Sequence, residues 1–460
     1  MSLEQTILGP ILIPRPDGRV DFVPDGALRC DASGLIDYVG PASALPLSLA
    51  SSRTARGLIT PPFLDAHIHI PQHPIRGHFM DGVNANPPEG RLLAGLNKNV
   101  FPAEAKCADD TYTARILEEF AHETLSQGVV GGAAYMTVHP DAAEMALETL
   151  SPLWSLGPVL MEMNCPKYLR TDRAKVNEAY VKKLAERFVR RFIMTDRFAV
   201  AVGSDLRQWA ARMSSDFGLR MQTHLNEQIR EKEFVEKKLY THYASYTDVY
   251  YRDGLLDHDA ILAHCVHMSD AEINLVARAE AVVAHCPTSN TLLCSGIMPL
   301  DRIRAAGIEY AICTDVGASP TTSILAEMAT FVKIHIRRSD RATPSEALYR
   351  TTLAPAKILG IDDQVGSLEV GKPMSFIEIA CDQKFTSADD AITGMLFDGP
   401  CDRGPWIDEL LIATDELQRG SLDLGPKLTM LENEIRATAK RMEKKVQAVT
   451  VAGREIWRRL

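Results

Sequence analysis

Short apolar runs alternate with amphipathic stretches along most of the chain, and this alternation constrains the fold more than any other feature. Each run has the length and composition of a buried parallel strand. Helical patterns separate several of them, opening at Ser or Asp and closing near Gly. Eight such repeats over roughly 300 residues predict a (β/α)8 TIM-like barrel. The runs are LITPPFLDAHIHI, GVVGGAAYMTV, GPVLMEMN, RFIMTDRF, LRMQTHL, AILAHC, AVVAHC and EYAICTD.

The two ends of the chain have a different pattern. The segment ALRCDASGLIDYVG alternates around a turn, and GSLEVGKPMSFIEI and KKVQAVTVAGREIW return to that style. We therefore predict a small β-sandwich domain built from residues 1–60 and 365–460, beside a barrel of residues 61–364. A helical extension with Leu428, Leu431, Ile435 and Met442 at helical spacing is expected to pack on its own barrel rather than on a second subunit.

Composition excludes several classes of function. The net charge is −10, and Lys and Arg are scattered along the chain, which argues against nucleic-acid or anionic-membrane partners. Nine cysteines without C-x-x-C spacing suggest neither a disulfide framework nor a thiolate zinc site. No signal-peptide pattern or membrane-length apolar run is seen, so we expect a cytoplasmic protein with a small-molecule substrate.

Histidine and aspartate recur where the predicted strands end. Taken alone, a strand histidine is more often a hydrogen-bonded core residue than a metal ligand. Recurrence on five strands changes the balance, because the carboxyl ends of barrel strands meet at one face. Imidazole and carboxylate groups there suit one catalytic Zn²⁺ or Fe²⁺. The residues concerned are His67, His69, His224, His264, His285 and Asp315, with Glu227 close enough to His224 to exchange protons with water at the metal.

These motifs resemble the amidohydrolase superfamily and, within it, the guanine deaminases. The resemblance covers nearly the whole barrel, in PPFLDAHIHIPQ, FPAE, TVHP, THLNE, YTDVYYRDGLLDHDAILAHCVHMSD, AHCPTSN and TDVGASP. It implies a homodimer that converts guanine to xanthine and ammonia. It also implies a single metal, because strand four, RFIMTDRF, has no lysine at its end.

The resemblance assigns roles residue by residue. Metal ligation falls to His67, His69, His224, His264 and Asp315, with His264 contacting either the metal or its water. Proton transfer falls to Glu227, helped by Asp315 and His264, and binding of the base falls to Gln72, Arg197 and His285.

Several departures from the family pattern leave other substrates open. Asp196 stands where proline is usual, AVGSD follows the Arg-Phe pair, and the loop after Gln72 lacks a tryptophan. Isoxanthopterin or another pterin, and 8-oxoguanine, are therefore alternative substrates. Hydrolysis of a cyclic amide or of a chlorinated or alkylamino ring is a rival reaction, and a non-catalytic scaffold is a rival of another class, disfavoured because every expected ligand is present.

Overall fold

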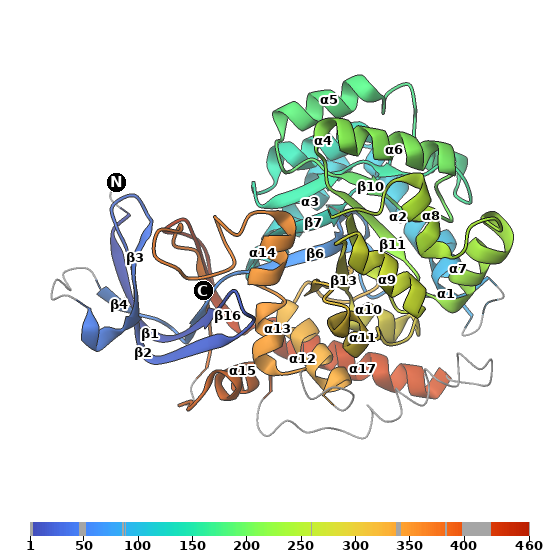
Figure 1. Ribbon diagram of the computed structural model, residues 1–460. Helices are drawn as coiled ribbons and strands as arrows, with labels where there is room; N and C mark the ends of the chain where they lie inside the picture. The colour runs from blue at the N-terminus through green and yellow to red at the C-terminus, as the bar shows by residue number, and fades with distance from the viewer. Residues whose placement is uncertain are drawn as a thin grey trace.

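A closed parallel barrel forms the larger part of the molecule (Figure 1). The computed structural model describes residues 3–45, 52–84, 87, 89–258, 260–336, 342–381, 384–397 and 425–459. All strand pairs in the two barrel sheets are parallel, as the near-continuous apolar runs predict. The barrel strands are β6 (Phe63–His69), β7 (Val129–Tyr135), β8 (Trp154–Gly157) with β9 (Val159–Leu160), β10 (Met194–Asp196), β11 (Met221–Leu225), β12 (Ala260–His264), β13 (Val282–His285) and β14 (Tyr310–Ile312).

The two barrel sheets meet at two places, which we call seams, and backbone hydrogen bonds join them at both. Beside β6, the Asp315 N–H donates to the His67 carbonyl at 2.9 Å, and the His69 N–H donates to the Val316 carbonyl at 2.7 Å. Beside β8, the Leu156 N–H donates to the Arg191 carbonyl at 2.9 Å. The first seam brings the first and last barrel strands together at the end where His67, His69 and Asp315 lie.

Helices between the strands begin and end near the residues that the sequence indicates. Asp109 accepts a hydrogen bond from the Tyr112 N–H at the start of α3, and Ser269 and Glu272 form a capping box on α9. The helices are α1 (Arg91–Gly95), α2 (Phe101–Ala105), α3 (Asp110–Ser126), α4 (Pro140–Thr149), α5 (Glu178–Arg187), α6 (Ser204–Phe217), α7 (Ile229–Phe234), α8 (Tyr246–Asp253), α9 (Asp270–Arg278), α10 (Pro287–Leu292), α11 (Leu300–Ala305), α12 (Ile324–His335), α13 (Pro344–Tyr349), α14 (Leu353–Leu359) and α15 (Ala388–Leu396).

Strands from both ends of the chain share one sheet beside the barrel, so the termini lie in the same part of the molecule (Figure 1). β5 (Leu58–Thr60) pairs with β15 (Phe376–Ile379), and this contact joins the N-terminal and C-terminal strands. The order within the described residues is β17 (Arg454–Arg458), β16 (Val446–Val451), β15, β5, β1 (Gln5–Pro14), β2 (Val20–Cys30) and β3 (Ile36–Pro41), with β4 (Ser52–Thr54) paired to β1. The predicted fold class, a barrel with a β domain made from both ends, is confirmed.

The C-terminal helix α17 (Gly425–Met442) packs on the barrel, as its amphipathic pattern predicts. It lies beside α10 and α12 (Figure 1). Ile435 of α17 is buried against Ile334 of α12. The side chains of Leu428 and Leu431, and residues 398–424 of the extension, lie outside the described part of the chain. Among the described helices, none combines the length and the hydropathy that crossing a bilayer requires.

Candidate active site

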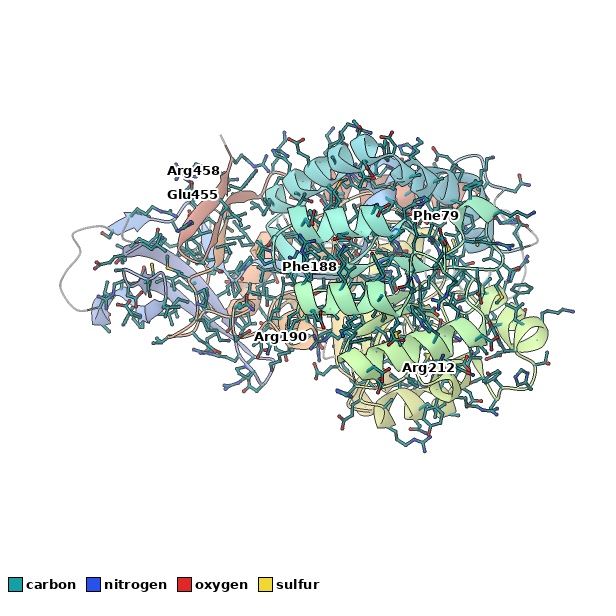
Figure 2. The ribbon with its side chains drawn as sticks, turned by 90° about the horizontal axis from the view of Figure 1, so that it is seen from above. Phe79, Phe188, Arg190, Arg212, Glu455 and Arg458 are labelled. Carbon is teal, nitrogen blue, oxygen red and sulfur yellow. The ribbon has the colours of Figure 1, made fainter. Side chains whose placement is uncertain are left out.

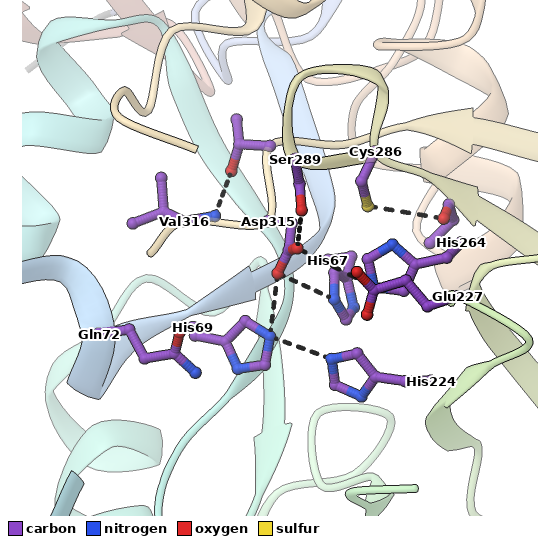
Figure 3. A network of polar contacts seen from close by, with 12 residues as sticks. His67, His69, Gln72, His224, Glu227, His264, Cys286, Ser289, Asp315 and Val316 are labelled. Carbon is purple, nitrogen blue, oxygen red and sulfur yellow. Dashed lines mark hydrogen bonds and ion pairs between the residues drawn. The ribbon is translucent and has the colours of Figure 1, made fainter. Parts of the chain in front are cut away.

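Four of the predicted metal ligands converge at one end of the barrel (Figure 3). His67 and His69 alternate along β6, His224 lies on β11, and Asp315 follows β14. One ligand atom from each of these four residues lies within 4.8 Å of each of the others. All four side chains are buried, so the cluster forms at the closed end of a pocket rather than on the surface.

Burial keeps the three imidazoles of this cluster neutral. It lowers the pKa of His67 to about 4, lowers the pKa of His69, and holds the pKa of His224 well below its ordinary value. Nδ1 of His224 lies 2.6 Å from the Arg197 carbonyl oxygen, which can only accept, so the ring proton is on Nδ1. The lone pair on Nε2 of His224 therefore points into the cluster.

The cluster brings ring nitrogens and a carboxylate oxygen within contact distance of one another, an arrangement that a cation between them would stabilise. Nε2 of His69 is 3.1 Å from Oδ1 of Asp315 and 3.3 Å from Nε2 of His224. Nε2 of His67 lies 3.4 Å from Oδ1 of Asp315 and is buried without a hydrogen-bond partner in the described part of the chain. Three neutral nitrogens and one carboxylate oxygen form a donor set suited to a divalent metal such as zinc.

Asp315 is held in its ionised form in this position. Burial alone would favour the protonated acid, but the His67 and His69 rings that face its carboxylate favour the ionised form and place its pKa well below the ordinary value. Ser289 donates a hydrogen bond of 2.6 Å to Oδ2 of Asp315 (Figure 3). Because Ser289 occupies Oδ2, Oδ1 remains free to face the imidazoles.

His264 lies next to the four-residue cluster but is not part of it. Its Nδ1 is 2.9 Å from the Asn290 side-chain oxygen, and its Nε2 is 3.6 Å from Glu227 and 3.9 Å from Asp315. Burial opposes a charge on this ring, yet Glu227 and Asp315 raise its pKa overall. Direct metal ligation by His264 stays a prediction, whereas its contact with the two acidic groups is observed.

Glu227 lies where a proton carrier is needed. Glu227 is labelled beside His264 in Figure 3. It is 1% exposed, lines the pocket, and accepts a hydrogen bond of 2.8 Å from Ser295. Burial raises its pKa to about 7. A carboxylate with a pKa near neutrality can both take and release a proton during one reaction cycle.

A pocket of about 360 Å³ opens from the cluster, a volume suited to a small heterocycle. Its lining combines polar and apolar side chains. The residues that line it are His69, Gln72, Phe79, Leu92, Leu96, Arg197, Phe198, His224, Glu227, Leu293 and Asp315.

Gln72 and Arg197 both line this pocket, and Glu104 holds them together. Arg197 donates from Nη1 to both carboxylate oxygens of Glu104, at 2.9 and 2.7 Å. The Gln72 amide donates to the same carboxylate at 3.1 Å. Because Gln72 is anchored through its amide nitrogen, its carbonyl oxygen is available as an acceptor, while Arg197 retains further N–H donors.

Replacing Glu104 by glutamine is expected to destabilise the protein and weaken binding of the base. Arg197 and Glu104 are almost fully buried, and a buried charge that loses its partner costs roughly 3–5 kcal/mol. We expect a higher KM and a lower free energy of unfolding. Enzyme kinetics and denaturant titration measure the two effects.

Glu144→Gln is the matched control, because Glu144 pairs with Lys183 and Arg187 at the surface. Exposed pairs of this kind contribute about 0–1 kcal/mol. Equal effects of the two substitutions on KM and on unfolding would contradict the positioning role of Glu104.

His285 is placed differently from the other predicted site residues. Its Nε2 lies 3.0 Å from Nε2 of His335, and its ring also packs against Phe331. It is not among the described residues that line the pocket. Contact of His285 with a substrate therefore stays a prediction that the pocket geometry does not support.

Asp196, the departure from the family pattern that lies beside Arg197, is a buried structural residue. Oδ1 of Asp196 accepts hydrogen bonds of 2.9 Å from both Thr223 and Tyr250, and burial raises its pKa to about 6. These contacts join β10 to β11 immediately before Arg197 and His224. Asp196 thus supports the pocket without lining it.

Three residues that support the site were not singled out in the sequence. Glu104 lies in FPAE, and Ser289 and Asn290 lie in AHCPTSN, which are motifs of the family resemblance. The motifs gave a signal, but spacing alone could not show that Glu104 from α2 reaches Gln72 and Arg197.

The chain belongs to the amidohydrolase family, whose model matches residues 58–403. Two relatives are 32% identical to it: guanine deaminase from Escherichia coli, over 71% of this chain and 74% of the relative, and probable guanine deaminase from Deinococcus radiodurans, over 81% and 85%. The solved structure of the Escherichia coli guanine deaminase aligns with a TM-score of 0.77 at 26% identity, covering 99% of this chain and 100% of that one.

Proposed function

We propose that this protein is a metal-dependent deaminase that hydrolyses guanine to xanthine and ammonia. The observation that carries the proposal is one pocket whose lining includes three members of the cluster together with Glu227, Gln72 and Arg197. The relatives at 32% identity are a guanine deaminase and a probable guanine deaminase, which supports guanine over other rings.

The metal would be held by His67, His69, His224 and Asp315, whose converging donor atoms fit a divalent cation. When bound, such a cation supplies the Lewis acidity that makes water a competent nucleophile near neutral pH. Zinc is the proposed ion, and iron(II) accepts the same donors.

Glu227 moves the protons of the reaction. It takes a proton from the attacking water and delivers it to the ring nitrogen beside the aminated carbon, which is C2 in guanine. The new C–O bond makes this carbon tetrahedral. Asp315, whose Oδ2 lies 3.9 Å from Nε2 of His264, would take the proton of the new hydroxyl group and pass it to the amine as the C–N bond breaks and the C=O bond forms. One water is consumed and one ammonia leaves.

Gln72 and Arg197 form hydrogen bonds with the polar edge of the base, while apolar side chains contact its faces. The acceptor oxygen of Gln72 suits a ring N–H, and the remaining donors of Arg197 suit a ring carbonyl or unprotonated nitrogen. Phe79, Leu92 and Leu293 supply apolar contacts in the pocket lining. A ring lacking the matching groups would leave buried polar atoms unpaired and would be strongly rejected.

Purified, zinc-loaded protein is expected to release one ammonia per guanine and to form xanthine, followed by ultraviolet absorbance and by an ammonia assay. Isoxanthopterin and 8-oxoguanine serve as comparison substrates. Turnover of one of these without turnover of guanine would support hydrolytic deamination but contradict the assignment of guanine as the substrate. No ammonia from any aminated ring would favour the scaffold alternative. The homodimer and the cytoplasmic location stay predictions of the resemblance.

A further inference from the structure

A second cavity lies beside the active-site pocket and shares part of its lining. It has a volume of about 550 Å³. Phe79 and Leu293 line both spaces, so these two side chains form a common wall. Figure 2 shows Phe79 on the side of the barrel remote from the terminal strands. The other residues that line the second cavity are Gly77, Met80, Asp81, Arg91, Leu292, Ala318 and Glu432.

The common wall is apolar and tightly packed. Phe79 is 5% exposed and Leu293 is 2% exposed. Gly95 on α1 leaves room for the Phe79 ring, because a Cβ at that position would lie 2.3 Å from a ring carbon. A shorter side chain at Phe79 would therefore open space without leaving a polar group unpaired.

The C-terminal helix holds the segment that carries Phe79. Arg436 on α17 donates a hydrogen bond of 2.5 Å to the Gly77 carbonyl, and Glu432 fixes the Arg436 guanidinium at 2.7 Å. The Gly77 N–H donates to the Gly317 carbonyl at 3.1 Å, next to the site. Gly77 has φ +73, and a Cβ there would meet Arg436 and Pro320 at less than 3.0 Å. The wall is thus fixed from two sides.

We propose that Phe79 and Leu293 determine substrate size, because they confine the active site to bases that carry no methyl or larger group on a ring nitrogen. This inference rests on the proposed deaminase function. The second cavity has the volume to receive a methyl or larger group that the wall now blocks. Phe79 is then a specificity-determining residue that takes no part in the chemistry.

Phe79→Ala is expected to broaden specificity toward substituted bases. The measurement is kcat/KM for 7-methylguanine and 9-methylguanine, each divided by kcat/KM for guanine. At least one ratio is expected to rise about tenfold or more, since one methyl group in an apolar pocket changes kcat/KM roughly 10–200-fold. Leu293→Ala is expected to act in the same direction and serves if the first variant does not fold.

Met80→Ala is the matched control, because Met80 lines the second cavity but not the active-site pocket. Its two ratios are expected to equal those of the unmodified protein. Unchanged ratios in folded Phe79→Ala and Leu293→Ala would overturn the inference while leaving the deaminase proposal intact. If the unmodified protein deaminates another base and not guanine, only the assignment of guanine fails, and the ratios are measured with the accepted base and its N-methyl derivatives.

Discussion

Glu227→Gln is expected to lower kcat about 10²–10⁴-fold, the contribution typical of a positioned general acid–base. Glutamine keeps the size of the side chain and can still accept the hydrogen bond from Ser295, but it cannot take a proton. Because the lost interaction belongs to the transition state, kcat and kcat/KM are expected to fall together. Steady-state kinetics measure both, and elemental analysis checks that the metal is still bound.

Glu231→Gln is the control for this substitution. Glu231 is also buried, four residues along the chain, but its carboxylate accepts hydrogen bonds from the backbone N–H groups of Glu227 and Gln228 at 3.0 Å. Replacing the Glu231 carboxylate is expected to lower the thermal midpoint of the protein and to change kcat far less than Glu227→Gln does. Turnover retained in Glu227→Gln would refute the proton-carrier role.

Loss of the metal is expected to have the second large effect. Its donors come from β6, β11 and the residues after β14, so a bound cation ties together parts of the barrel that are far apart in sequence. A ligand present at 100 times its Kd stabilises the folded state by about 2.7 kcal/mol. Treatment with a chelator should therefore lower the thermal midpoint. It should also reduce turnover by roughly a thousandfold or more, because free water is a poor nucleophile at neutral pH.

His69→Ala separates this effect from general destabilisation. Calorimetry is expected to show that the chelator lowers the midpoint of the unmodified protein but leaves that of His69→Ala unchanged. His139→Asn is the control, because His139 precedes α4 and is not part of the cluster. It should respond to the chelator as the unmodified protein does. A chelator-sensitive midpoint in His69→Ala would place the metal elsewhere.

The barrel could be predicted because its strands are almost wholly apolar. Runs such as AILAHC and AVVAHC bury both faces, and β12 and β13 occupy them. Polar caps located the starts of α3 and α9 for a local reason, since a side chain there satisfies a free backbone N–H. The predicted third strand, GPVLMEMN, begins at Gly157, whereas β8 already begins at Trp154. Pro158, which has no backbone N–H, separates β8 from β9.

The site was predictable where strand geometry decides the direction of a side chain. His67 and His69 share one face because residues two apart in a strand point the same way. The alternation of side chains along a strand no longer predicts their direction where the backbone leaves the strand conformation. His264 has φ 72 and Asp315 has φ 52, both in the left-handed region. Such residues turn at the strand end, so the sequence could not distinguish a metal ligand at His264 from a neighbour. The Glu104 contacts depend on where α2 lies in the folded barrel, which the spacing of residues along the sequence does not show.

The pairing of Arg197 with Glu104 sets what the pocket can favour. The guanidinium enters the site already neutralised by a carboxylate, so it adds directional N–H groups without adding net positive charge. A ring that has lost a proton therefore gains little Coulomb attraction from Arg197, and any such attraction would come from the cation held by the four-residue cluster. At Arg197 and Gln72, rings are expected to be distinguished by their donors and acceptors rather than by their charge.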